Sequence, residues 1–183
     1  CALPICFEMT IKGPNGKFSI ANDVPSKALF LSGGSGVTPL LSMTRWLFDT
    51  GRDVDVVYVH GARALRDRIC DDELTWYARS MRAFRVVYVL SQALPEDAWT
   101  GLTGNLSIEK LNAAVPDFME RTVYMCGPVP FMAAVKAMLE EAAFPMKNFH
   151  QESFGGAPPP QAPAASIPRA TQSLAAMLPR PTE

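Results

Sequence analysis

The sequence predicts an α/β fold, with a doubly wound parallel sheet of about five strands covered by helices on both faces. Short apolar segments rich in β-branched residues alternate with segments of helical periodicity between residues 27 and 154. A glycine-rich loop, Ser32 to Pro39, joins the first strand segment to the first helical segment. A second junction, Cys126-Gly127-Pro128, follows a later strand in the same way. Junctions of this kind form the ligand-binding crevice of doubly wound sheets.

The predicted elements alternate between strand and helix. The five strands are expected at Lys27–Ser32, Asp53–His60, Phe84–Leu90, Thr122–Cys126 and Asn148–Phe154. The four helices are expected at Pro39–Asp49, Asp67–Arg82, Ser107–Ala114 and Val129–Ala143. The valine-rich second strand is apolar on both faces, which is typical of a central strand in a parallel sheet.

Local signals define several of these boundaries. Thr38 suits the N-cap of the first helix, and Pro39 suits its first turn, where a missing N–H is tolerated. Gly51 is expected to end that helix, and Ser107 is expected to cap the third one.

The two ends of the chain differ in character from its middle. Strand-like pieces at Phe7–Thr10 and Lys17–Ile20 flank a glycine-rich turn, so residues 1–24 are interpreted as the remnant of a β domain. Residues 25–155 form the main domain. Residues 156–183 are rich in proline and alanine and are expected to be a linker or a disordered tail.

Composition bounds the class of protein. The chain has 183 residues, of which 48% are hydrophobic and 19% are charged, so it can bury one main core. A formal net charge of -1 without basic runs gives no reason to expect nucleic acid or a membrane surface as a partner. The four cysteines include no C-x-x-C pair, which argues against a metal site in this chain. Without a signal peptide or an apolar run of about 18 residues, the expected compartment is the cytoplasm.

The loop after the first strand is the first candidate binding site. Glycines let backbone amides approach an anion closely, and the following helix directs its positive end to the same place. The expected guest is the pyrophosphate of a dinucleotide. The candidate residues are Gly33, Gly34, Ser35, Gly36, Val37, Thr38 and Pro39. Because Pro39 stands where the dinucleotide fingerprint has its third glycine, a purely structural loop and a methyltransferase loop are alternatives.

The end of the second strand lacks the carboxylate that grips the ribose in ordinary dinucleotide-binding folds. We expect Arg63 to hold the adenosine end instead, and His60 is a further candidate for cofactor binding. Arg66 or Asp67 lies close enough in the sequence to assist. The alternative is that these are solvated charges at the start of a helix.

Cys126 lies at the carboxyl end of a predicted strand and just before a helix, where a thiol is oriented and partly acidified. The alternative is a small buried hydrophobic residue. Gly127 and Pro128 complete the junction and are candidate contacts for the same ligand. Glu152 and Phe154, at the last strand, are either site residues or an ordinary strand end.

Four motifs resemble those of the ferredoxin-NADP reductase family in order and spacing. They are Gly13-Pro14-x-Gly16-x-Phe18, the segment Phe30 to Leu40, Cys126-Gly127-Pro128, and the segment His150 to Phe154. The resemblance covers about residues 12 to 155. The chain is most similar to NADH-dependent reductases that carry a plant-type iron-sulfur domain and serve hybrid-cluster proteins or Rieske-type oxygenases and demethylases.

The resemblance implies an enzyme that passes a hydride from NADH to FAD and then single electrons to an iron-sulfur acceptor. It makes residues 1–24 the remnant of the flavin-binding barrel and residues 25–155 the NAD(P)-binding domain. Residues 33–39 would hold the pyrophosphate. The expected partners are the nicotinamide dinucleotide, the flavin domain, and an iron-sulfur protein or oxygenase that accepts the electrons.

The resemblance also implies roles for the remaining site residues. Cys126 would lie near the nicotinamide as a positioning contact, Glu152 beside the site of hydride transfer, and Phe154 against the flavin ring. NADPH is an alternative to NADH, because three arginines, at positions 63, 66 and 68, offer positive charge for an additional phosphate.

The chain also departs from the family pattern. It starts with Cys1 rather than methionine and lacks nearly all of the flavin barrel, so it is interpreted as a fragment that is inactive alone. FAD and an iron-sulfur cluster would belong to missing domains. One competing function is a non-catalytic nucleotide-binding subunit that relays electrons in a larger complex. Another is a methyltransferase, which would leave the Cys-Gly-Pro motif without a purpose.

Overall fold

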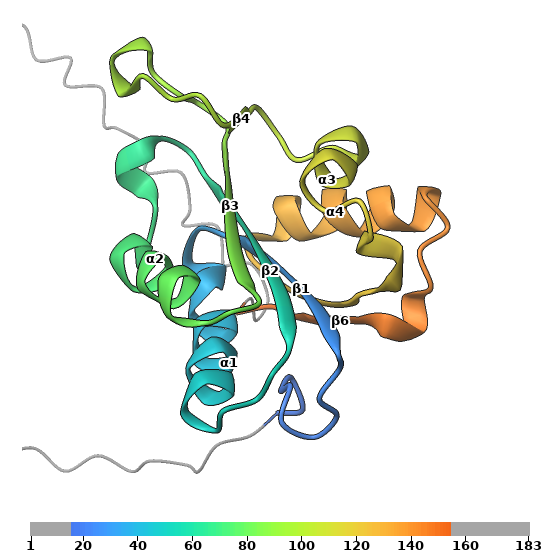
Figure 1. Ribbon diagram of the computed structural model, residues 1–183. Coiled ribbons are helices and arrows are strands. Elements are labelled where there is room, and N and C mark those ends of the chain that lie inside the picture. The colour runs from blue at the N-terminus through green and yellow to red at the C-terminus, as the bar shows by residue number, and fades with distance from the viewer. Residues whose placement is uncertain (1–15, 155–183) are drawn as a thin grey trace, which may run out of the picture.

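The computed structural model describes residues 16–154, and its sheet confirms the predicted α/β class (Figure 1). Six strands pair in parallel in the order β4-β3-β2-β1-β5-β6. The strands are β1 Lys27–Gly33, β2 Asp55–Ala62, β3 Phe84–Leu90, β4 Leu102–Thr103, β5 Thr122–Cys126 and β6 Phe149–Glu152. The α-helices are α1 Val37–Asp49, α2 Asp71–Ser80, α3 Ile108–Ala114 and α4 Val129–Glu141.

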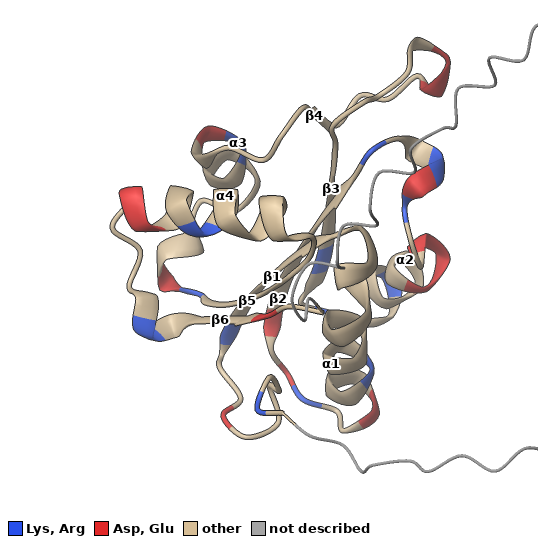
Figure 2. Ribbon diagram, turned by 180° about the vertical axis from the view of Figure 1, so that it is seen from behind, with Lys and Arg blue, Asp and Glu red and all other residues tan. Residues whose placement is uncertain are grey.

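Helices cover both faces of the sheet. α1 and α2 lie on one face and α3 and α4 on the other, as Figures 1 and 2 show from opposite sides. Alternate residues of each strand therefore enter two separate cores. Phe30 and Tyr58 pack under α1 and α2, whereas Leu31 and Val59 pack under α3 and α4. In the first core, the Phe30 ring makes edge-to-face contacts with Tyr58 and Tyr124, with ring centroids 5.7 Å apart in both pairs.

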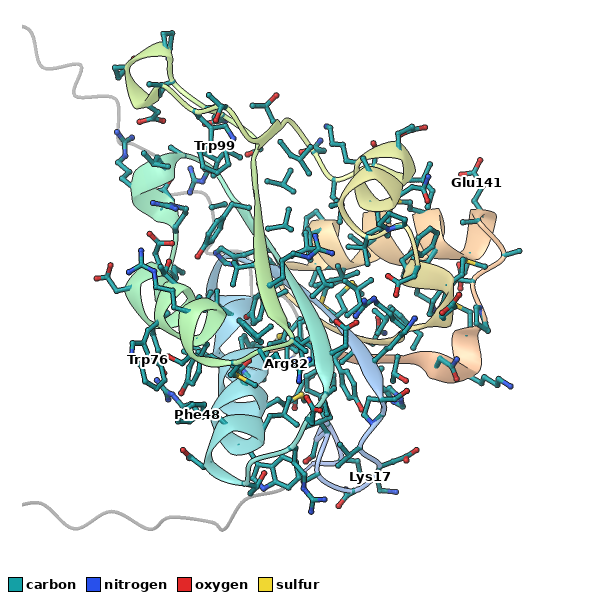
Figure 3. All side chains as sticks on the ribbon, in the orientation of Figure 1. Lys17, Phe48, Trp76, Arg82, Trp99 and Glu141 are labelled. Atoms are coloured by element: carbon teal, nitrogen blue, oxygen red, sulfur yellow. The ribbon has the colours of Figure 1, made fainter. Side chains whose placement is uncertain are left out.

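The five predicted strands are confirmed, and the structure adds a sixth. β4 has two residues between Gly101 and Gly104, which is too short for a periodic pattern to reveal. It follows a projecting loop in which the indole N–H of Trp99 donates to the Leu102 carbonyl at 3.0 Å (Figure 3).

Several predicted boundaries are confirmed and two are wrong. Gly51 follows α1 with a φ of 61°, and the Ser107 side chain caps α3. Thr38 is not the N-cap of α1, because Gly36 takes that position and the Thr38 hydroxyl donates to the Ser35 carbonyl at 3.1 Å.

The second helix begins at Asp71 rather than Asp67. Leu65–Asp67 forms a separate 3-10 turn, and Cys70 has a φ of 57°, which interrupts the helical path. This turn contains Arg66 and Asp67, two of the residues predicted to lie at the binding site.

The segment before β1 is also different from the prediction. Lys17–Ile20 is not a strand, although Ile20 is buried in the core under α1 and α2. The predicted strand at Phe7–Thr10, the Gly13-Pro14 turn and the proline-rich tail lie outside the described residues.

Candidate functional site

A cleft of about 610 Å³ opens at the carboxyl edge of the sheet. From β1 the chain winds toward β4 in one direction and later toward β6 in the other, so the cleft lies beside the point where the strand order reverses. The ends of three strands, the β2–α2 connection, the loop before α3 and the start of α4 form its walls. Its lining includes Gly33, Gly34, Gly61, Arg63, Arg66, Asp67, Asn105, Leu106, Pro128 and Phe131. A cleft of this size suits a small-molecule ligand.

The glycine loop and the Cys-Gly-Pro junction are in direct contact at this edge. A Cβ atom on Gly36 would overlap the backbone carbonyl of Cys126, so only glycine fits at this position. A Cβ atom on Gly127 would lie 2.7 Å from the Phe131 ring and 3.1 Å from the Gly33 nitrogen. The two junctions predicted from the sequence therefore form one continuous surface, and two of their glycines serve this close packing.

Gly34 is the glycine that stays open to a ligand. Its φ of +50° lies in the left-handed region, and a Cβ atom added there would meet no other atom within 4 Å. Gly34 lines the cleft, and α1 begins three positions later without a side-chain hydrogen bond at its N-cap. The first N–H groups of α1 are therefore free of a side-chain cap, which favours an anion.

The other predicted residues of the glycine loop are arranged around this point. Gly33 also lines the cleft. The remaining five predicted residues, which form the turn and the start of α1 and do not line the cleft, are Ser35, Gly36, Val37, Thr38 and Pro39.

His60 does not reach the cleft. Its side chain is completely buried, and its Nδ1 lies 2.6 Å from the hydroxyl oxygen of Ser32. Burial lowers the pKa of His60 to about 4, so the imidazole is neutral at physiological pH. His60 therefore does not line the cleft, although it was predicted to be a cofactor-binding residue.

Arg63, Arg66 and Asp67 all lie on the cleft wall, as predicted for the end of β2. Among residues 16–154 neither arginine has an ion-pair partner. The Asp67 carboxylate accepts a hydrogen bond of 3.2 Å from the Ala64 N–H, which closes the 3-10 turn. Arg68 does not line the cleft and is bound to other groups, which leaves two arginines available to a ligand.

Cys126 is completely buried at the end of β5, and it does not line the cleft. Burial, together with the charge of Glu152, raises the pKa of its thiol. The raised pKa does not agree with the expected partial acidification of the thiol, and burial makes Cys126 a small packed side chain at the end of β5. The register of β5 and β6 sets Glu152 directly beside Cys126.

Glu152 and Phe154 lie outside the cleft. Glu152 lines a second hollow of about 410 Å³, together with Lys17 and Tyr124. Phe154 follows β6, and 58% of its surface is exposed. The structure thus brings Cys126 and Glu152 together but separates both from the cleft lining.

Sequence reasoning missed most of the cleft lining, including Asn105, Leu106 and Phe131. Asn105 and Leu106 lie in a loop that has no motif, so the sequence holds no signal for them. Phe131 follows the Cys-Gly-Pro motif and has the spacing of an ordinary helix core position. Its ring lies 3.1 Å from where a Gly33 Cβ would stand and 3.7 Å from where a Gly61 Cβ would stand. A large aromatic residue after a glycine-rich junction was the available signal.

The described part of the chain contains neither a metal-binding cluster nor a membrane-spanning helix. Among residues 16–154, no three His, Cys, Asp or Glu side chains are grouped so that they could hold a metal ion. No helix in this range has the length and apolar character needed to cross a membrane. Cys70 and Cys126 are both free thiols.

Proteins with similar sequences include reductase subunits of oxygenase systems. Residues 30–137 match the family model of the oxidoreductase NAD-binding domain. A glycine betaine monooxygenase reductase subunit of Pseudomonas aeruginosa is 41% identical over 152 residues, covering 83% of this chain and 42% of that protein. A stachydrine N-demethylase reductase subunit of Rhizobium meliloti is 40% identical over 146 residues, covering 80% of this chain and 41% of that protein. The chain therefore spans about two fifths of the length of these relatives.

Solved structures of lower identity share the fold. The FAD/NAD-binding domain of a nitric oxide dioxygenase from Vibrio cholerae has a TM-score of 0.65 at 21% identity, over 78% of this chain and 56% of that one. A ferredoxin NADP+ reductase from Neisseria gonorrhoeae, solved with bound FAD and NADP, has a TM-score of 0.60 at 19% identity, over 76% and 61%. These structures show the fold alone, whereas the family match and the reductase relatives show that the chain belongs to the ferredoxin-NADP reductase family, of which it contains the NAD-binding domain.

Proposed function

We propose that this chain is the NAD(P)-binding part of an electron-transfer flavoprotein reductase. In this function NADH delivers a hydride to FAD, and the flavin passes single electrons to an iron-sulfur acceptor. The observation that carries the proposal is the contact between the glycine loop and the Cys-Gly-Pro junction beside an open cleft. This contact joins the start of α1, which suits a phosphate, to the end of β5.

The residues present fit a dinucleotide. The diphosphate would lie at Gly34 and the amino end of α1, where free N–H groups and the helix dipole favour an anion. Arg63 and Arg66 would hold the adenosine end, and Phe131 offers an apolar surface on the cleft wall. A bound nicotinamide supplies the hydride, while these residues bind and orient the coenzyme.

The proposed catalytic positions are Cys126, Glu152 and Phe154. The raised pKa of the Cys126 thiol keeps it protonated at neutral pH, which supports a positioning contact near the nicotinamide rather than a nucleophile. Glu152 stands beside Cys126, and Phe154 is exposed at the end of β6, where it could cover a flavin ring in an adjoining domain.

The same proposal covers the domain organisation. It makes residues 1–24 the remnant of an FAD-binding barrel, residues 25–155 the NAD(P)-binding domain, and residues 156–183 a linker or tail rich in proline and alanine. The electron acceptor is an iron-sulfur protein or an oxygenase, in keeping with the names of the monooxygenase and demethylase relatives. The cytoplasm remains the predicted compartment.

Coenzyme binding is the direct test. In calorimetric titrations of the chain, we expect binding of NADH, weaker binding of NADPH, and no binding of S-adenosylmethionine. Tighter binding of NADPH would assign Arg63 and Arg66 to an additional phosphate and change the proposed coenzyme. Binding of S-adenosylmethionine alone would overturn the proposal in favour of a methyltransferase.

One observation favours the second candidate, a non-catalytic subunit that relays electrons: Cys126 is buried and lies off the cleft lining. To decide, the chain is joined to the flavin domain of a reductase relative, and flavin reduction by NADH is followed by stopped-flow absorbance. Cys126→Ala and Glu152→Gln should each slow this step by about ten-fold or more, because both residues set the approach of the coenzyme. Unchanged rates in both variants would leave these residues with structural roles only.

A further inference from the structure

Side chains from three neighbouring strands meet beneath the carboxyl edge, on the face covered by α1 and α2. Strand register sets Ser32 of β1 beside His60 of β2, and His60 beside Tyr88 of β3. Ser32 Oγ lies 2.6 Å from His60 Nδ1, and the His60 and Tyr88 rings meet edge to face with centroids 6.0 Å apart. Because Ser32 directly precedes the glycine loop, this row of contacts begins at one wall of the cleft.

Arg68 extends the row to another wall, the β2–α2 connection. Its guanidinium carbon lies 4.9 Å from the centroid of the Tyr88 ring. Its Nη2 lies 2.8 Å from Asp71 Oδ2, and its Nε donates to the Leu65 carbonyl at 3.2 Å. Since Leu65 begins the 3-10 turn Leu65–Asp67, Arg68 fastens this turn to β3.

The contacts surround an enclosed polar site. His60 Nε2, the Tyr88 hydroxyl and Asp71 Oδ1 are buried, and within residues 16–154 none of them makes a hydrogen bond of good geometry, although the Tyr88 hydroxyl is near enough to the Asp71 carboxylate to interact with it. Burial, and next the nearby Asp71 carboxylate, raises the pKa of Tyr88, so its phenol stays protonated. Buried polar atoms of this kind are normally paired, often by an internal water molecule. Their clustering distinguishes this region from ordinary apolar core.

We propose that Arg68, Tyr88 and His60 are positioning residues that hold the turn with the cleft arginines in a fixed relation to the glycine loop. The inference rests on the proposed function, namely that the cleft binds a dinucleotide. None of the three lines the cleft, so they act on a ligand through the two loops. Arg63 and Arg66 contact the ligand, whereas Arg68 determines where those two arginines stand.

Tyr88 gives the cleanest test, because it can be changed without altering a residue of the cleft. Tyr88→Leu removes the ring under Arg68, and Tyr88→Phe keeps the ring as a matched control. In calorimetric titrations with NADH, we expect Tyr88→Leu to bind about three- to ten-fold more weakly and Tyr88→Phe to bind as the unmodified chain does.

Arg68 variants examine the same contact from its other side. Arg68→Ala should weaken NADH binding about as much as Tyr88→Leu. The double variant should bind NADH no more weakly than the weaker-binding of the two single variants, since both changes break the same contact. Arg68→Lys keeps the charge but lacks the planar guanidinium, so it should fail to restore binding.

Salt dependence separates positioning from direct contact. Arg66→Ala removes a charge that faces the ligand, so it should flatten the dependence of NADH affinity on salt concentration. Tyr88→Leu should leave that dependence as it is, because it removes no charge.

Hydrogen exchange gives a readout that needs no ligand. In the unliganded chain, backbone amides of residues 63–70 should exchange faster in Tyr88→Leu and Arg68→Ala, with α4 as the internal reference. Unchanged exchange in this segment together with unchanged NADH affinity would overturn the inference. If Tyr88→Leu does not fold, Arg68→Ala provides both measurements, because its side chain is already 23% exposed.

NADH binding and hydrogen exchange together distinguish failure of the inference from failure of the proposed function. A chain that binds no dinucleotide would overturn the proposed function, while exchange at residues 63–70 would still show whether Arg68 and Tyr88 hold the turn. A chain that binds NADH equally well with and without these side chains would overturn the inference alone.

Discussion

The two edges of the sheet differ in how completely their buried polar groups are paired. At the amino edge, where β1, β2 and β5 begin, the buried Arg121 side chain pairs with Asp55 and Asp117 at 3.0 and 2.8 Å. Its guanidinium also donates to the Ala28 carbonyl, and Lys27 joins the group through Asp117. The charges at this edge are therefore paired, and they link the starts of three strands.

At the carboxyl edge the side chains of His60, Tyr88 and Cys126 are neutral, and the polar atoms of the first two are incompletely paired. Burial shifts the pKa values of His60, Tyr88 and Cys126 in the direction that keeps each side chain uncharged. Glycine backbone contacts take the place of side chains where the two loops meet. The comparison indicates that paired charges at the amino edge stabilise the fold. At the carboxyl edge fewer polar groups are paired, and the backbone stays open to a ligand.

Arg121→Ala should produce the largest effect and should be confined to stability. The variant removes the shared partner of two carboxylates and its hydrogen bonds to strand carbonyls, so we expect a loss of about 3 to 4 kcal/mol in the free energy of unfolding. Urea denaturation measures this loss, and NADH affinity of the folded variant should be retained. Arg45→Ala, which breaks the more exposed pair with Glu73, is the control and should cost far less. Similar losses in the two variants would contradict the contrast between the edges.

As the pH falls, the contribution of the carboxyl edge to stability should be lost before that of the amino edge. The pKa of His60 is lowered from 6.5 to about 4 by burial, so the unfolded chain takes up this proton first. Its contribution to stability is complete above pH 6.5 and is lost as the pH falls toward 4, by up to about 3 kcal/mol. A hydrogen bond from Arg121 lowers the pKa of Asp117 from 3.8 to about 2, so the loss at the amino edge follows at lower pH.

Denaturant titrations across this pH range measure the effect, and His60→Asn is the matched control. Asparagine does not titrate but keeps polar side-chain atoms that can form a hydrogen bond with the Ser32 hydroxyl in place of Nδ1. The variant should therefore lose less stability between pH 6.5 and 4 than the unmodified chain does. Equal slopes would show that His60 is not the group responsible.

Substitution of either of two glycines should have a smaller effect, in which a loss of stability can be told from a loss of NADH binding. Gly34 and Gly51 both have positive φ values, +50° and +61°, and a Cβ atom on either would meet nothing within 4 Å. Each change to alanine should cost about 1 kcal/mol of stability through backbone strain. Gly34→Ala alone should also weaken NADH binding, because only Gly34 lines the cleft. Equal affinities in calorimetry would remove the glycine loop from the binding site.

The sequence was sufficient for the order of the elements and for the meeting of the two junctions. Strand and helix periodicities locate the long elements, and the carboxyl ends of parallel strands necessarily share one edge. Side-chain direction was harder to predict. Adjacent strand residues point to opposite faces, so Gly61 lines the cleft while His60 enters the other core. Nothing in the local pattern indicates which face carries the cleft, and the same uncertainty made Cys126 look more accessible than it is.

Alkylation of the Cys126 thiol should show the smallest effect. Its rate tests whether the end of β5 is closed to solvent. Cys126 is completely buried and its pKa is raised, whereas Cys70 is partly exposed. Since alkylation requires an accessible thiolate, iodoacetamide should modify Cys126 at about one tenth of the rate of Cys70 or less, as followed by peptide mass spectrometry. In urea the two rates should become similar, because unfolding removes the burial. Rapid modification of native Cys126 would instead show an accessible thiol and remove the distinction between a closed β5 end and an open cleft.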